Sequence, residues 1–445
     1  MQRNRIAPEG MMVGNSTRVL RGAAFIGMAG GSHIAHAGTG AGINGGDTAL
    51  LFASSALVLF MTLPGLALFY GGLVRAKNFL SVLMHCFAIA ALVSILWVAG
   101  AYSLAFSGAG PWIGDLARVG LAGLQQVRAG LTVPENIFAF YQMMFAIITP
   151  ALIIGAFPER VRFGWLMLFS GAWLLLVYVP VAHWIWGGGW LATRGALDFA
   201  GGMVVHTTAG ISALVIALMI GPRRGFPTTV MPPHSPAMTM IGAGMLWVGW
   251  FGFNGGSALA ANGVAGDALM ATHLSASAAA LTWAMLEWAK IGKATSVGLV
   301  TGAVAGLATV TPAAGYISAG GGVAMGVVAA LVCFGAVLVI KQRWKVDDSL
   351  DVFAIHGVGG IIGSLMLALF ASAAFGGNGS AGYRDIGAQL GAQGLGVAVT
   401  ILWSAVLTFI IARAAAWIVP MRVEAEAEHD GLDLSSHGER AYEFE

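Results

Sequence analysis

The chain has 445 residues, of which 58% are hydrophobic and only 9% are charged. Soluble domains carry about a quarter charged residues, so this composition excludes an ordinary water-facing surface and predicts an all-α integral membrane protein. The formal net charge of +2 argues against nucleic acid as a partner. The two cysteines, Cys86 and Cys333, each lie in an apolar run, which argues against a disulfide framework and against a cysteine metal site.

Residues 1–37 have the pattern of a signal peptide. Arg18 and Arg21 precede a short apolar run, and Ala35-His36-Ala37 has the small-x-small pattern of a cleavage site. Cleavage at this site would leave the new N-terminus outside the cytoplasm. The alternative is a disordered N-terminus that is not cleaved.

A helix that spans a membrane needs about 20 mainly apolar residues. The sequence predicts about eleven such helices in a transmembrane domain over 38–421, followed by a polar tail over 422–445. The expected helices occupy 48–73, 79–106, 137–157, 162–185, 200–221, 237–257, 267–289, 295–315, 319–340, 352–375 and 388–419.

The connections between the expected helices alternate in their content of Lys and Arg. Connections that follow odd-numbered helices are basic, and the others are poorer in Lys and Arg. By the positive-inside rule, this alternation predicts an N-terminus outside and a C-terminus in the cytoplasm. The basic residues that follow odd-numbered helices are Arg75, Lys77, Arg160, Arg162, Arg223, Arg224, Lys290, Lys293, Lys341, Arg343, Lys345 and Arg422.

Two stretches about 150 residues apart resemble each other, Asp198 to Ile211 and Asp351 to Ile361. Both read Asp, then His, then two residues, then a small residue, Gly and Ile. The first stretch lies in the fifth expected helix and the second in the tenth. Because five is an odd number, the second half must be inverted relative to the first. The sequence therefore predicts two inverted five-helix repeats plus a C-terminal helix, with a substrate site near the middle of the membrane.

Each stretch places one histidine, His206 or His356, inside an apolar segment. Two ionisable residues in matching places of an inverted repeat favour proton handling over a core role. A bis-histidine haem or metal site is the competing interpretation, but no acidic or cysteine ligands stand nearby. If the histidines touch, Asp198 and Asp351 must lie below the membrane surface, where we expect them to cap helix N-termini.

Aromatic residues at helical spacing form a second candidate site. Three residues lie at i, i+3 and i+7 on the sixth expected helix, and two lie at i and i+4 on the third, so each set shares one helix face. Such residues either anchor helices and pack in the core, or they form a cage that attracts a small cation. The residues concerned are Trp250, Phe253, Ser257, Tyr141, Phe145 and Trp186.

From about Leu51 to its C-terminus, the chain resembles the ammonium transporter family (Amt/Mep/Rh), and specifically its bacterial Amt branch. The resemblance is carried by the two histidine stretches and by three further motifs. These motifs are Leu63-Pro64-Gly65-Leu66-Ala67-Leu68-Phe69-Tyr70-Gly71-Gly72, Ala182-His183-Trp184-Ile185-Trp186-Gly187-Gly188-Gly189 and Gly431-Leu432-Asp433-Leu434-Ser435-Ser436-His437-Gly438-Glu439-Arg440-Ala441-Tyr442. The resemblance implies a homotrimer in the bacterial inner membrane, with one pore in each protomer.

The resemblance also implies roles for individual residues. Trp186, Ser257 and Phe145 match an outer site that recruits ammonium, with the Ala200 carbonyl beside it. Tyr141 stands in this vestibule, where bacterial members often carry Phe.

Further residues match the pore of the family. Phe145 and Phe253 resemble its phenylalanine gate, and His206 and His356 its twin-histidine pair. Asp198 resembles the buried acid that supports recruitment. Trp250 resembles the tryptophan near the histidine pair, and the tail resembles that of members regulated by a cytoplasmic PII-type protein.

The expected function is therefore ammonium transport without a cofactor. Ammonium would be recruited as a cation and lose a proton, and ammonia would pass through an apolar pore while the histidines relay the proton. The competing functions are an ammonium sensor that signals through its tail and a neutral-gas channel like those of the Rh branch. An enzyme is not expected, because no nucleophile–base or metal arrangement is present.

Overall fold

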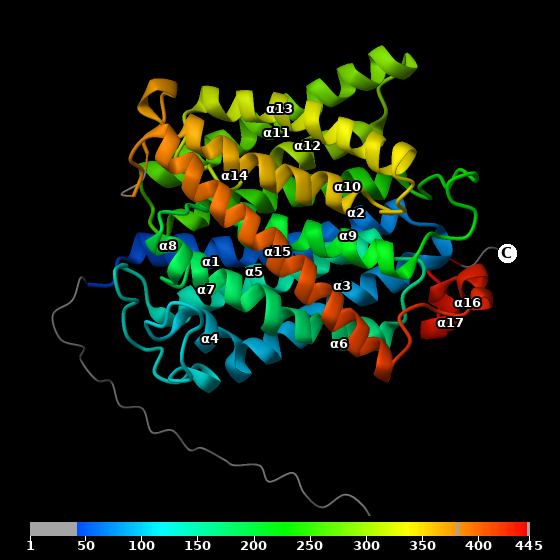
Figure 1. The fold of residues 1–445 in the computed structure, drawn as a ribbon, viewed down its shortest axis with the longest axis horizontal. Helices are drawn as coiled ribbons and strands as arrows, with labels where there is room; N and C mark the ends of the chain where they lie inside the picture. Colours follow the sequence, from blue (N-terminus) through cyan, green and yellow to red (C-terminus); the bar gives the residue numbers. More distant parts are fainter. Residues whose placement is uncertain (1–41, 380–381, 443–445) are drawn as a thin grey trace, which may run out of the picture. The chain divides into compact units, whose positions relative to one another are not determined.

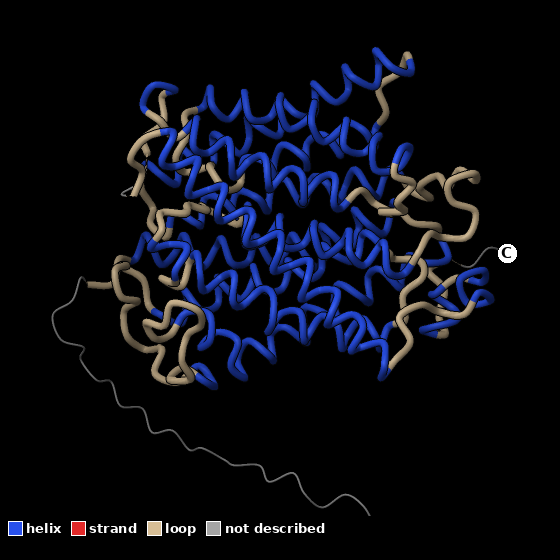
Figure 2. The backbone as a smooth tube through the Cα atoms, viewed as in Figure 1, coloured by secondary structure: helices blue, strands red, loops and turns tan. Residues whose placement is uncertain are grey.

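The computed structural model describes residues 42–379 and 382–442, which form a bundle of long helices (Figure 1). The predicted signal peptide, 1–37, lies outside the described residues. Figure 2 shows that the helices run along the bundle and that the loops gather at its two ends. In the described part of the chain, β structure is limited to two isolated bridges.

The helices of the described residues fall into two halves and a short tail. The first half contains α1 (Gly45–Phe60), α2 (Ala67–Leu73), α3 (Phe79–Leu96), α4 (Tyr102–Phe106), α5 (Glu135–Ile153), α6 (Phe163–Trp173), α7 (Val179–Ile185), α8 (Trp190–Thr193) and α9 (Thr208–Ile220). The second half contains α10 (Pro236–Trp250), α11 (Gly263–Ile291), α12 (Ser296–Val310), α13 (Ala319–Leu338), α14 (Val358–Phe370) and α15 (Ile386–Ile418). The tail contains α16 (Ala425–Asp430) and α17 (Leu432–His437). Wider π-helical turns extend several helices, at Met61–Leu66, Trp97–Ala101, Leu174–Tyr178, Gly202–Thr207, Phe251–Gly255, Val339–Arg343 and Phe353–Gly357.

Within the described ranges, 10 helical segments are long and apolar enough to cross a membrane. They are Gly45–Leu73, Ala76–Phe106, Glu135–Ala156, Phe163–Thr193, Gly202–Ile220, Pro236–Ala258, Gly263–Ile291, Ala319–Arg343, Phe353–Phe370 and Ile386–Ile418. The remaining predicted span, 295–315, is shorter than expected, because α12 ends at Val310. Pro312 follows closely, and proline cannot donate the hydrogen bond that would continue the helix. The predicted all-α membrane fold with about eleven spans is confirmed.

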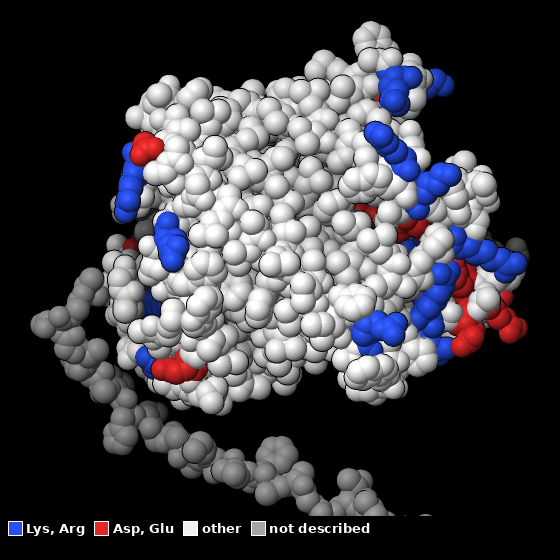
Figure 3. Space-filling view, viewed as in Figure 1, with Lys and Arg blue, Asp and Glu red and all other residues white. Residues whose placement is uncertain are grey.

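Charged side chains are distributed as a membrane requires. The space-filling view in Figure 3 shows a wide band without charges between two charged ends. Lys and Arg are most frequent at the end where α16 and α17 lie (Figures 1 and 3). A band of uncharged side chains is compatible with the hydrocarbon interior of a bilayer.

Helices α9 and α14, each with the π-helical turn that precedes it, cross in close contact at glycines. A Cβ atom added to Gly210 would lie 2.2 Å from the Cα atom of Gly357. A Cβ atom added to Gly360 would lie 2.6 Å from the carbonyl oxygen of Gly202. Small residues allow this approach, which is how helices gain contact in a membrane. The reciprocal pattern of contacts is the one that inverted repeats produce.

The π-helical turn that leads into α9, Gly202–Thr207, is buried, and Asp198 caps it. One carboxylate oxygen accepts hydrogen bonds from the backbone N–H groups of Gly201 and Gly202, at 2.8 and 2.6 Å. The other accepts from Met203 and Val204, at 2.7 and 3.0 Å. The side chain of Asp198 is 5% exposed. The predicted capping role of this acid is therefore confirmed.

In the second half, Asp348 takes the capping role that was predicted for Asp351. The two carboxylate oxygens of Asp348 accept the backbone N–H groups of Val352 and Phe353, at 3.0 and 2.7 Å. Asp351 instead has a left-handed backbone with a φ of 63°. Its carboxylate forms an ion pair with Lys341 at 2.8 Å. The capping prediction for Asp351 was therefore wrong, because the true repeat partner of Asp198 lies three residues earlier.

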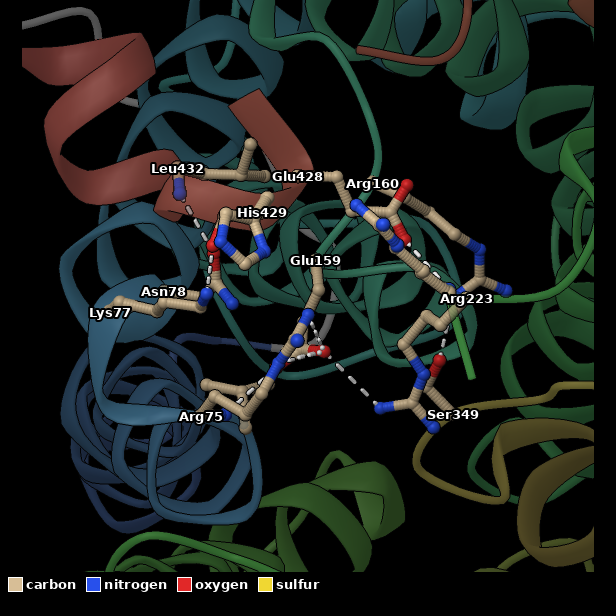
Figure 4. A network of polar contacts seen from close by, with 12 residues as sticks. Arg75, Lys77, Asn78, Glu159, Arg160, Arg223, Ser349, Glu428, His429 and Leu432 are labelled. Carbon is tan, nitrogen blue, oxygen red and sulfur yellow. Dashed lines mark hydrogen bonds and ion pairs between the residues drawn. The ribbon is translucent and has the colours of Figure 1, made fainter. Parts of the chain in front are cut away.

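Buried ion pairs hold together the loops at the tail end of the bundle (Figure 4). The Arg223 guanidinium contacts Asp347 at 2.9 Å and Glu159 at 3.5 Å. Arg75 contacts Glu159 at 2.8 Å. Arg160 is fully buried and donates to the Asp347 backbone carbonyl at 2.7 Å. These contacts connect the loop before Asp348 to three other loops of the bundle.

The guanidinium groups keep both buried acids ionised. Burial by itself raises the pKa of Glu159, but Arg223 and Arg75 outweigh it and hold the pKa below its usual value. Burial likewise raises the pKa of Asp347, and Arg223 with Arg160 outweighs it, so this pKa is also lowered. A carboxyl group whose pKa is lower in the folded state than in the unfolded state stabilises the fold at pH values above its unfolded-state pKa. This stabilisation disappears as the pH falls through the folded-state pKa.

We predict that Arg223→Gln destabilises the protein because it leaves the buried Asp347 without its main partner and leaves the buried Glu159 with Arg75 alone. Removal of one partner from a buried pair costs about 3–5 kcal/mol. The loss in the thermal unfolding midpoint, measured in detergent, should be full at about pH 7. It should shrink as the pH falls from about 4 through the lowered folded-state pKa values, where both acids become protonated. Arg162→Gln, which breaks an ion pair with the exposed Glu424, is the matched control. An equal loss in both variants at about pH 7 would contradict the prediction.

A second prediction separates the two acids that precede His356. Asp348→Asn places an amide N–H group against a backbone donor and should cost about 1–3 kcal/mol. Asp351→Asn breaks only a partly exposed ion pair, which is worth about 0–1 kcal/mol. Thermal unfolding of the two variants measures the difference. If Asp351→Asn is the more destabilised variant, the assignment of the cap to Asp348 is wrong.

Candidate functional site

The two histidines of the repeat meet at the centre of the bundle. The Nδ1 atoms of His206 and His356 lie 3.2 Å apart, and the ring planes are inclined by 17°. Their exposed fractions are 1% and 4%. A contact between two ring nitrogens requires that one carry a proton and the other accept it. The pair can therefore hold and pass a proton.

Local backbone geometry places both histidines. His206 lies in the turn Gly202–Thr207, and His356 lies in the turn Phe353–Gly357. Both turns are π-helical, a wider form that is frequent at functional sites. Among the described residues, no group of three or more His, Cys, Asp or Glu side chains could hold a metal ion.

A small enclosed cavity lies against the histidine pair. The volume that the centre of a water-sized molecule can occupy is about 10 Å³, so the cavity has room for about one such molecule. Apart from the two histidines and the indole of Trp250, the wall of the cavity is made of apolar side chains. The lining residues are Met61, Leu66, Phe69, Ile148, Leu152, Val205, His206, Leu246, Trp250, Phe253, Val304 and His356.

Aromatic rings close the cavity on one side. The rings of Phe145 and Phe253 are 4.3 Å apart, and Phe253 also lies over His206 at 6.0 Å. Trp250 stacks on His206 at 5.6 Å, with an interplanar angle of 23°. The Trp250 indole N–H donates to the Thr311 hydroxyl, which fixes the orientation of the ring. The two phenylalanines predicted as a gate therefore touch, and one of them, Phe253, stands next to His206.

The residues predicted for the outer site lie beyond the phenylalanine pair. Phe145 contacts Tyr141 at 5.1 Å and Trp186 at 5.6 Å, both edge to face. The Tyr141 hydroxyl lies 3.2 Å from the Ser257 hydroxyl. Ser257 also donates to the Phe253 carbonyl at 2.8 Å. The structure thus brings all these side chains together around Phe145.

The sixth helix does not reach Ser257 as the regular α-helix that the sequence predicted. The helix α10 ends at Trp250, and Phe251–Gly255 forms a π-helical turn. A short 3₁₀ turn, Gly256–Ala258, follows and carries Ser257. The π-helical and 3₁₀ turns do not have the α-helical number of residues per turn, so the contact between Ser257 and Tyr141 does not follow from α-helical spacing.

A hydrogen bond connects the aromatic site to the cap of the histidine helix. The Trp186 indole N–H donates to the Asp198 backbone carbonyl at 2.7 Å. Ala200, two residues later, is fully buried. The segment of Asp198 therefore serves two neighbours, because its carbonyl holds Trp186 and its carboxylate holds the helix that carries His206.

A wider vestibule opens on the other side of the histidine pair. It measures about 190 Å³ and shares His356 with the small cavity. The ion pair of Lys341 and Asp351 lies in its wall. Sequence reasoning named Lys341 only as a marker of topology and did not place it in this wall, which it reaches from the end of the ninth span.

Comparisons with known proteins identify the chain over most of its length. Residues 49–442 match the model of the Ammonium Transporter Family. An ammonium transporter of Bacillus subtilis is 44% identical over 402 residues, covering 89% of this chain and 98% of the relative. The ammonium transporter Amt1 of Archaeoglobus fulgidus is 44% identical over 399 residues, covering 89% of this chain and 99% of the relative.

Solved structures agree with this result. A structure described as a sensor Amt protein matches with a TM-score of 0.82 and 27% identity, covering 88% of this chain and 98% of that one. Candida albicans Mep2 matches with a TM-score of 0.79 and 36% identity, covering 86% of this chain and 87% of that one. Sequence and fold therefore lead to one conclusion: the chain belongs to the ammonium transporter family and is a multi-pass membrane transporter rather than an enzyme.

Proposed function

We propose that the protein recruits ammonium as a cation, removes one proton and conducts ammonia through the pore. The observation that carries this proposal is the position of the histidine pair. Its two Nδ1 atoms lie 3.2 Å apart against a cavity of about 10 Å³, directly beyond the ring pair of Phe145 and Phe253.

The outer site is suited to a small cation. The faces of Trp186 and Phe145 carry the negative part of the ring quadrupole, and such an attraction is worth about 0.5–2 kcal/mol. The hydroxyls of Ser257 and Tyr141, with the Ala200 carbonyl, supply acceptors for the N–H groups of ammonium. Asp198 supports the site from below through the bond of its carbonyl to Trp186.

The narrow cavity explains how ammonium is distinguished from potassium. The cavity has room for one small molecule, so an ion cannot carry its hydration shell past the phenylalanine pair. A charge in such surroundings costs several kcal/mol or more. Ammonium avoids most of this cost when one N–H bond breaks and the proton leaves, because ammonia is neutral. Potassium has no proton to lose.

The histidine pair then carries the proton. A neutral imidazole accepts a proton on one nitrogen and releases one from the other. His206 faces the phenylalanine gate, and His356 faces the vestibule at the tail end. A proton that reaches His206 can pass between the two Nδ1 atoms to His356, while ammonia moves through the cavity beside them.

We further propose that the tail end of the bundle faces the cytoplasm of a bacterial cell and that the N-terminus lies outside the inner membrane. The support is the distribution of basic residues. Of the Lys and Arg residues in the described connections, few lie at the opposite end of the bundle. Those are Arg118, Arg128, Arg194 and Arg384. A cytoplasmic tail is accessible to a PII-type regulatory protein, which we propose as its partner.

An ammonium sensor is the second candidate function. One structural relative is described as a sensor Amt protein. The tail of this chain is also docked firmly, since the Asp433 carboxylate accepts the backbone N–H groups of Leu80 and Ser81 at 3.0 and 2.8 Å. A neutral-gas channel is less well supported, because a neutral gas needs no cation cage.

Electrical measurement tests these functions. We expect proteoliposomes to give solid-supported-membrane currents with ammonium and none with potassium. In the double variant His206→Ala with His356→Ala, the ammonium current should vanish or lose its selectivity against potassium. His273→Ala, an exposed histidine on α11, is the matched control and should keep the current.

Two outcomes would contradict the transport mechanism. Binding of ammonium without any current would favour the sensor. Ammonia flux without current, equal in the wild type and in the double variant, would show a neutral channel in which the histidines are only structural.

We also propose that the protein is a homotrimer with one pore in each protomer. Native mass spectrometry of the protein released from mild detergent should give three times the mass of one chain. The assembly should persist in the double histidine variant, because that site lies inside a protomer. A monomeric or dimeric mass at all detergent concentrations would contradict the proposal.

A further inference from the structure

Two buried glutamines of α15, Gln389 and Gln393, have no part in the site described so far. Their side chains are 3% and 0% exposed. They lie one helical turn apart on the face of α15 that meets the segment from Gly195 to Asp198. This segment is the chain that enters the outer site, so the glutamines stand directly behind it.

The side-chain amide of Gln393 both accepts a hydrogen bond from the backbone of Leu197 and donates one to it. Its Oε1 atom accepts the Leu197 N–H at 2.8 Å, and its Nε2 atom donates to the Leu197 carbonyl at 2.8 Å. The Nε2 atom also donates to the Ser364 carbonyl on α14, at 2.9 Å. A primary amide is a donor and an acceptor in one plane, which this reciprocal pairing requires.

Gln389 completes the contact. Its Nε2 atom donates to the Gly195 carbonyl at 3.0 Å and to Gln393 Oε1 at 3.1 Å. The second bond holds the Gln393 amide in the orientation that pairs with Leu197. The two glutamines therefore act as one clamp, which we define as Gln389 and Gln393, on the backbone before Asp198.

The clamp is connected to the outer site through the peptide bond between Leu197 and Asp198. Leu197 is joined directly to Asp198, whose carbonyl holds the Trp186 indole at 2.7 Å. The Asp198 carboxylate also holds the turn that carries His206. A shift of Leu197 would therefore move Trp186 and Ala200 together, relative to Phe145 and Ser257.

The matching position in the second repeat is held by a different side chain. Asp347 precedes Asp348 as Leu197 precedes Asp198, and its carbonyl accepts from the buried guanidinium of Arg160 at 2.7 Å. A positive charge thus lies next to the backbone that precedes Asp348, whereas a neutral amide lies next to the backbone that precedes Asp198. Within the described ranges, Asp198 forms no ion pair with Lys or Arg.

We propose that Gln393, held by Gln389, is the positioning residue of the outer ammonium site. It fixes the position of Trp186 and Ala200 relative to Phe145 and Ser257, and it adds no positive charge next to Asp198. A cationic clamp at this place would oppose recruitment of a cation, and a purely apolar side chain would leave Leu197 without its bonds. The inference rests on the proposed function, since it assigns a role within the same site.

The test compares the ammonium concentration for half-maximal current with the maximal current. Gln393→Met keeps the length of the side chain and removes every bond of the amide. Small displacements at a binding site cost up to about 100-fold. We expect the half-maximal concentration to rise about tenfold, while the maximal current changes by less than about twofold. Gln389→Met removes only the supporting bonds and should raise it by about two- to threefold.

The matched control lies on the same helix. Thr400 is buried on α15, and its hydroxyl has no hydrogen-bond partner among the described residues. Thr400→Val should therefore leave the half-maximal concentration unchanged. Gln393→Glu keeps an acceptor for the Leu197 N–H but sets a carboxyl oxygen against the Leu197 and Ser364 carbonyls, so it should also raise the half-maximal concentration.

Clear results would overturn the inference. One is an unchanged half-maximal concentration in Gln393→Met, and another is a fall in maximal current alone, since a structural role would reduce the amount of active protein. If Gln393→Met does not fold, Gln389→Met and Gln393→Glu carry the same test, and unchanged values in both would overturn it. A wild type that gives no ammonium current would instead contradict the proposed function itself.

Discussion

A helix that begins inside a membrane has no water to satisfy its first backbone N–H groups, and this constraint shapes the centre of the protein. Each histidine stands on such a helix. The protein meets the constraint with one buried carboxylate in each half, Asp198 and Asp348, which accept the free N–H groups. These acids let both helices start inside the bundle, where the Nδ1 atoms of the two histidines lie 3.2 Å apart.

The buried acids create a second requirement, because each must itself be held in place. The two halves meet it differently. At the tail end, Arg160 and the ion pairs around Arg223 hold the loop before Asp348. On the other side, the neutral amide of Gln393 holds Leu197. Under the proposed mechanism, this asymmetry keeps positive charge away from the site that recruits the cation.

Close packing joins the two halves of the bundle. Glycines at the crossing of α9 and α14 let the backbones approach to distances that no side chain would allow. The high glycine content of the sequence therefore has a specific purpose at this crossing, where it brings two irregular helix starts within reach of each other. The wider π-helical turns then direct His206 and His356 into a cavity with room for about one small molecule.

The sequence by itself determined the membrane fold, the approximate spans, the inverted halves and the histidine pair. These features depend on composition and on local pattern, because a buried charge or an unpaired backbone group is costly inside a membrane. Asp348 was also within reach, since it precedes His356 by eight residues just as Asp198 precedes His206. Only the tertiary structure decided that Asp351 pairs with Lys341, that Ser257 leaves the regular helix to meet Tyr141, and that Gln393 holds Leu197. Those contacts join residues far apart in the chain, and their geometry depends on how irregular turns and packed helices aim each side chain, which no local pattern encodes.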